Sequence, residues 1–106
     1  MGANHIRKSL FNSMIPQKMS VEEFKHLVMS FFSINYPTCT VSLGDDLVVH
    51  LTTKKGETVK SQPLVRAYDQ FRRRSFKDSA SSLNAAVEVV DKELKSLGVD
   101  SSGGRF

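Results

Sequence analysis

Hydrophobic and polar residues follow a helical period over most of the chain and alternate with a period of two only between residues 39 and 61. That stretch, CTVSLGDDLVVHLTTKKGETVKS, is rich in β-branched residues and is interrupted twice by turn-forming residues. It predicts a three-stranded antiparallel sheet at about residues 39–61. The segments on either side predict helices, so we expect an α+β fold in which the helices pack on this sheet.

Segment 20–33 carries the most complete helical signal of the chain. Ser20 is followed three residues later by Glu23, which is the pattern of a capping box at the start of a helix. Three phenylalanines lie on the apolar side, so this helix should supply much of the core volume. The apolar stripe consists of Val21, Phe24, Leu27, Val28, Phe31 and Phe32.

The predicted sheet contains two tight turns. Gly44-Asp45-Asp46 forms the first turn, in which Gly44 is free to adopt a positive φ, and Gly56 should take the left-handed position of the second. The central strand alternates clearly, and its inward row should be Leu47, Val49 and Leu51. The third strand is short and polar, which is typical of an edge strand that avoids pairing with other chains.

Two further helices are expected after the sheet, at about residues 63–75 and 79–97. Pro63 suits the first position of the former, with Ser61 or Gln62 as its cap. Asp78 or Ser79 can cap the latter. Together with a helix expected near the N-terminus, these segments predict the element order α-α-β-β-β-α-α.

The two ends of the chain receive separate predictions. Apolar residues within 1–15 recur at helical spacing and Pro16 ends the pattern, so residues 1–16 are interpreted as an arm that docks on the core or, alternatively, forms a dimer. Residues 99–106 are small, polar and glycine-containing, which predicts a disordered tail. We therefore expect a single small globular domain over residues 1–98.

The positive charge of this 106-residue chain is concentrated in one segment. The net charge is +4, yet residues 1–53 carry as many acidic as basic side chains, whereas residues 54–77 carry eight basic and two acidic ones. Local excess charge attracts anionic partners. The candidate partner-binding residues are Lys54, Lys55, Arg66, Arg72, Arg73, Arg74, Phe76 and Lys77.

Three interpretations of this basic segment remain open. It can bind an acidic surface of a protein partner, or grip the phosphates of a nucleic acid while Phe76 stacks on a base. It can also serve only solubility and helix-dipole compensation. The sequence favours a small non-catalytic interaction protein that binds or modulates another protein, with nucleic-acid binding as the alternative.

Motifs for catalysis, metals and cofactors do not rise above background. Cys39 and His50 are the nearest approach to a nucleophile and base, but no helix N-terminus follows the cysteine to lower its pKa. The histidines lack the spacing of a zinc site. The Asp45-Asp46 pair is explained by turn chemistry. We expect no enzyme activity, no metal and no cofactor.

Two features of the sequence bear on the cellular compartment. One cysteine precludes an internal disulfide and fits a reducing cytoplasm. No run approaches the roughly 18 apolar residues that a membrane span requires, so we expect no membrane partner.

Residues 40–97 resemble the opening part of an uncharacterised bacterial family typified by the Bacillus protein YtpQ. The shared features are a turn with adjacent acids at 44–46, an alternating strand at 47–51, a Lys55-Gly56 turn, a Gln62-Pro63-Leu64 joint and a helix containing Ala67-Tyr68. The resemblance implies an α/β sandwich core in a cytoplasmic protein of bacterial or phage origin. It implies no reaction and no catalytic residue.

Overall fold

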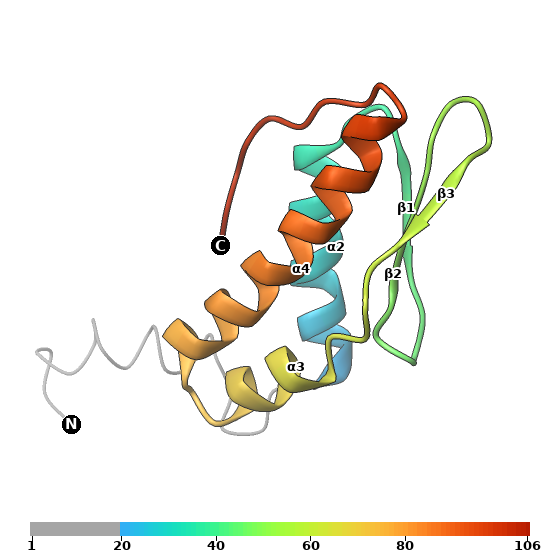
Figure 1. The fold of residues 1–106 in the computed structure, drawn as a ribbon. Coiled ribbons are helices and arrows are strands. Elements are labelled where there is room, and N and C mark those ends of the chain that lie inside the picture. The colour runs from blue at the N-terminus through green and yellow to red at the C-terminus, as the bar shows by residue number, and fades with distance from the viewer. Residues whose placement is uncertain (1–19) are drawn as a thin grey trace, which may run out of the picture.

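A computed structural model describes residues 20–106 of the chain, so the helix and arm expected within residues 1–16 lie outside the described residues. Helices α2 and α4 lie on one face of the sheet, and α3 runs across one end of the molecule (Figure 1). This architecture confirms the α+β class and the three-stranded antiparallel sheet, with the order α-β-β-β-α-α in the described part. The elements are α2 (Val21–Asn35), β1 (Thr40–Leu43), β2 (Val49–Thr52), β3 (Thr58–Lys60), α3 (Val65–Arg72) and α4 (Phe76–Ser96).

Helix α2 begins with the predicted capping box. The Ser20 hydroxyl accepts a hydrogen bond from the Glu23 amide at 3.1 Å, and the Glu23 carboxylate accepts one from the Ser20 amide at 3.3 Å. The helix continues past the predicted segment 20–33 to Asn35, where Pro37 leads us to expect its end, because the residue before a proline is pushed out of the α region. Phe24, Val28 and Phe32 are fully buried.

Replacing Ser20 by alanine is expected to lower the free energy of unfolding by about 1 kcal/mol, the usual cost of losing an N-cap side chain. Urea denaturation of the wild type and of Ser20→Ala measures this difference. Ser33→Ala, at an exposed position near the other end of the same helix, is the matched control and should change stability by less than about 0.5 kcal/mol. Equal losses in the two variants would show that the capping box does not stabilise α2.

The sheet has the order β1-β2-β3, and its inward row comes from all three strands. Leu51 pairs with Val41 on one side and with Val59 on the other, and both Leu51 and Val49 are fully buried. Gly56 has a φ of 87°, as predicted.

Gly44 does not use its freedom to adopt a positive φ, because Leu47 takes the left-handed conformation of the first turn, at φ 59°. The Leu47 amide donates to the Gly44 carbonyl at 3.1 Å and closes the turn. The Leu47 side chain is buried. Packing of this side chain in the core offsets the cost of about 1 kcal/mol that a positive φ carries for a branched residue.

Helix α3 begins two residues later than predicted and is not capped by Ser61 or Gln62. Leu64 is its N-cap, without a side-chain hydrogen bond. The Ser61 hydroxyl is committed to the sheet, where it accepts a hydrogen bond from the Val49 amide at 2.9 Å. The capping prediction failed because this buried amide takes the same hydroxyl.

Helix α4 begins at Phe76, three residues before the predicted start. Asp78 therefore lies in its first turn, where its carboxylate accepts a hydrogen bond from the Ser75 hydroxyl at 2.6 Å. Ser79 is buried and donates to the Ala67 carbonyl at 2.8 Å, which fastens α4 to α3. A hydroxyl that sequence suggested as a helix cap thus serves as a tertiary contact.

Residues 99–106 do not form the disordered tail that their composition predicts. After Gly98, at φ 82°, the chain turns back and runs beside α2 and α4 (Figure 1). The turn is a Schellman motif, in which the Val99 amide donates to Leu94 and the Gly98 amide to Lys95. We call residues 99–106 the strap. Hydrogen bonds from the Asn35 and Asn84 side chains hold it, which composition alone does not reveal.

Candidate interaction surface

Five of the predicted partner-binding residues lie on α3, on the turn that follows it and on the first turn of α4. We call this set the basic corner: Arg66, Arg72, Arg73, Arg74 and Lys77. All except Arg74 are exposed, and Arg74 is half-buried. Only two acidic residues, Asp69 and Asp78, lie within residues 66–78. The basic corner is therefore a region of positive charge on two consecutive helices.

A tight helix end places these arginines. The Arg74 amide donates to Phe71 and the Ser75 amide to Gln70, which together form a second Schellman motif. Its left-handed position is occupied by Arg74, at φ 61°, where glycine is usual. This turn ends α3 at Arg72, and it makes the predicted helix of 63–75 three residues too long at its C-terminal end.

Arg73 of the basic corner has an internal acidic partner. Arg73 Nε lies 3.3 Å from Asp69 Oδ2, one helical turn earlier. Both side chains are well exposed, so this pair stabilises the helix by a few tenths of a kcal/mol at most. A stronger acidic partner can compete for Arg73 at little cost.

Phe76, the aromatic member of the predicted set, packs inward. Its ring meets Phe71 at a centroid distance of 5.3 Å, edge to face, and Phe71 in turn meets the buried Phe24 at 5.9 Å. The phenylalanine is half-buried. Its ring packs edge to face on Phe71 beside the α3–α4 turn, so only part of the ring is available to stack on a base.

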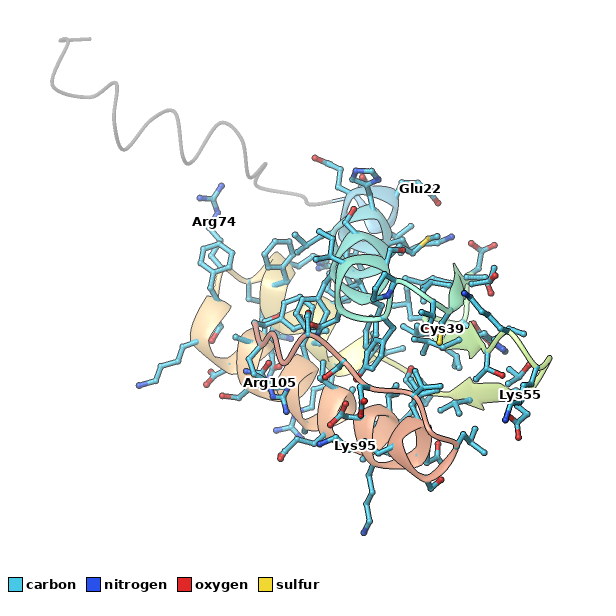
Figure 2. The ribbon with its side chains drawn as sticks, turned by 90° about the horizontal axis from the view of Figure 1, so that it is seen from above. Glu22, Cys39, Lys55, Arg74, Lys95 and Arg105 are labelled. Atoms are coloured by element: carbon cyan, nitrogen blue, oxygen red, sulfur yellow. The ribbon has the colours of Figure 1, made fainter. Side chains whose placement is uncertain are left out.

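Lys54 and Lys55 do not join the basic corner. Figure 2 shows Lys55 and Arg74 on opposite sides of the molecule, and in Figure 1 the β2–β3 turn and α3 lie at opposite ends. The charge of residues 54–77 predicts one continuous surface from the second hairpin to Lys77, and this prediction was wrong.

The hairpin geometry gives the reason. After the β2–β3 turn the chain runs back along β2, and the Leu64 amide donates to the Leu47 carbonyl at 2.8 Å just before α3 begins. Leu47 and Thr53 are six residues apart, which corresponds to roughly 20 Å of extended chain. Charges that are close in sequence are thus carried to the two ends of the sheet.

The candidate catalytic residues do not converge. The strand register pairs His50 with Ser42, three positions beyond Cys39, which corresponds to roughly 10 Å along the strand. Asp45 is engaged by Lys25 at 3.0 Å, and this hydrogen bond raises the pKa of the lysine. Within residues 20–106, no three or more His, Cys, Asp or Glu side chains are grouped so that they could hold a metal ion.

A buried polar network that sequence reasoning missed lies between α2, α4 and the strap. The Tyr36 hydroxyl donates to the Asp91 carboxylate at 3.1 Å, and Lys95 lies 3.3 Å from the other carboxylate oxygen. Burial and the Asp91 charge raise the pKa of Tyr36. Burial alone would raise the pKa of Asp91, but hydrogen bonds from Lys95, Tyr36 and Ser101 hold it below its ordinary value. The network is a structural contact between the helices.

Comparison with known proteins adds no relative. No family model matches the chain, and no curated protein or solved structure is significantly similar to it. The resemblance to the YtpQ family therefore stays a prediction. In the described part, no helix combines the length and the apolar character needed to cross a membrane.

Proposed function

We propose that this chain is a small, non-catalytic, cytoplasmic protein that binds an acidic surface of another protein through the basic corner. The observation that carries the proposal is the gathering of five basic side chains on one corner. Four of them are exposed and Arg74 is half-buried, and Asp69 is the internal acidic partner of Arg73. Complementary charge speeds the encounter of two proteins and fixes their orientation.

A pocket next to the corner supports binding of a protein. It has a volume of about 230 Å³ and lies between the start of α3 and the side of α4, where Arg66, Gln62, Ser82 and Ala85 line it. A pocket of this size accepts one side chain of a partner. Interfaces draw much of their binding energy from such buried contacts, with charges at the rim.

The position of Phe76 favours a protein partner over a single-stranded nucleic acid. Single strands are bound by exposed aromatic rings that stack on bases, together with basic side chains. Here the aromatic residue of the basic segment packs on Phe71. Nucleic-acid binding stays the alternative, and the same experiment distinguishes it.

The test is affinity capture from a lysate of the source organism with three baits. They are the wild type, Arg72→Glu/Arg73→Glu, and Lys54→Glu/Lys55→Glu. The two variants change the net charge equally, and all four positions are exposed, so folding should be preserved. We expect the arginine variant to capture at least about tenfold less of the partner protein, because two rim charges are reversed together. The lysine variant should retain it.

Two outcomes decide against the proposal. Equal loss with both variants would show that net charge, not the basic corner, determines capture. Loss of the bound material after nuclease treatment, together with binding that weakens steeply as salt rises, would show that the partner is a nucleic acid and not a protein.

A further inference from the structure

The strap is held against α2 and α4 by side chains that form hydrogen bonds with its backbone. The buried Asn35 side chain accepts a hydrogen bond from the Gly104 amide at 2.9 Å and donates one to the Gly104 carbonyl at 3.1 Å. Asn84 does the same for Phe106, at 2.7 Å and 3.2 Å. Each asparagine amide thus pairs with both polar groups of one residue, as a neighbouring strand would.

The last three residues of the strap alternate between contacted and exposed positions. The Ser102 amide donates to the Asn35 carbonyl at 3.0 Å, and the chain then turns at Gly103, which has a φ of 82°. Beyond this turn, Gly104 and Phe106 contact the asparagines, whereas Arg105 between them is exposed. Such alternation is typical of the recognition of a short extended peptide segment.

At two positions of the strap, the surrounding side chains restrict which residue fits. A Cβ atom at Gly104 would lie 2.9 Å from Asn35 Oδ1, a clash that the nearly fully buried Asn35 cannot relieve. The Phe106 ring stacks on Phe31 with a centroid distance of 4.0 Å. Recognition therefore requires glycine, then any residue, then an aromatic residue.

We infer that Phe31, Asn35 and Asn84 form a peptide-binding site that the strap occupies in the isolated chain. The occupant from outside is an extended segment of a partner that carries glycine, any residue and an aromatic residue. The strap itself shows which chemistry the site accepts. Because it is tethered, its effective concentration is of millimolar order, so a competing peptide must displace it.

The test uses a full-chain variant in which the strap no longer occupies the proposed peptide-binding site. Gly104→Ala should expel the strap while Phe31, Asn35 and Asn84 stay unchanged. A synthetic peptide, SSGGRF, is then titrated into the ¹⁵N-labelled variant and into the wild type. We expect saturable shifts at residues 31, 35 and 84 in the variant, and binding to the wild type that is at least about tenfold weaker because of the tethered strap.

Peptide controls test the two selected positions. Peptides with alanine in place of the second glycine or of the phenylalanine should fail to bind the Gly104→Ala protein. A second full-chain variant, Phe106→Ala, weakens the strap by removing its ring and provides the same vacant site should Gly104→Ala not fold. The inference is overturned if neither folded variant binds SSGGRF, or if the alanine peptides bind as well as SSGGRF.

Discussion

Phe24→Ala is expected to lower the free energy of unfolding by about 3–5 kcal/mol, the usual cost of removing a buried aromatic ring. The Phe24 side chain is fully buried. Its ring lies at centroid distances of 5.1 Å from Tyr68 and 5.9 Å from Phe71, so it joins α2 to α3. Domains of this size are stable by about 5–15 kcal/mol, so the variant should be close to unfolding.

Leu27→Ala is the matched control for this prediction, because Leu27 lies on the same helix and is 43% exposed. Leu27→Ala should lower the free energy of unfolding by less than about 1 kcal/mol. Urea denaturation with intrinsic fluorescence or circular dichroism measures both variants. Similar losses in the two would show that α2 does not face the core as described.

Asp91→Asn is expected to destabilise the protein by about 1.5–3 kcal/mol at neutral pH, the range for hydrogen bonds to a charged group. The aspartate is 7% exposed and joins Tyr36 of the α2 end to Lys95 of α4. Asparagine can still accept the Tyr36 hydrogen bond, but it loses the charge that attracts Lys95.

The pH dependence of this effect follows from the lowered pKa of Asp91. A carboxyl group whose pKa is lower in the folded state binds protons more readily when unfolded, so it stabilises the fold above its ordinary pKa of 3.8. This contribution is lost as the pH falls below that value. The stability difference between wild type and Asp91→Asn should therefore be full near pH 7 and shrink on acidification through pH 3.8.

Denaturant titrations at several pH values measure this difference. Glu88→Gln, an exposed carboxylate of the same helix, is the control and should show little effect at any pH. A difference for Asp91→Asn that stays constant on acidification would mean that the carboxylate charge does not stabilise the contact between α2 and α4.

Local signals in the sequence predicted the parts of the fold that local chemistry determines. The Ser20–Glu23 capping box needs only residues within one helical turn, and it forms as expected. The alternation of β2 and the left-handed Gly56 are likewise local. These features were sufficient to predict the sheet, its flanking helices and the α+β class.

The features that sequence did not predict depend on contacts between distant residues. Leu47 and Arg74 take left-handed conformations that glycine usually adopts, so no glycine marks either turn. The strap looks disordered by composition, and it is held by Asn35 and Asn84, which are 49 positions apart in the chain. No pattern within one segment reveals such a pair.

The candidate surface was predicted in part. Arginines 72–74 and Lys77 lie together because they flank the short turn that connects α3 to α4. Lys54 and Lys55 belong to the same charged segment, but the hairpin carries them to the far end of the sheet (Figure 2). Charge counting along the chain cannot resolve this difference, because it depends on the direction in which β3 returns.

The most direct test of the basic corner is a titration of the ¹⁵N-labelled protein with an oligoglutamate peptide, followed by amide chemical shifts. We expect saturable shifts at residues 66, 72–74 and 77 that weaken as the salt concentration rises, because surface charges are screened over about 10 Å at 0.1 M salt. Residues 54 and 55 should change little. Shifts concentrated at residues 54 and 55, or no saturable shift anywhere, would contradict the assignment of the basic corner as the binding surface.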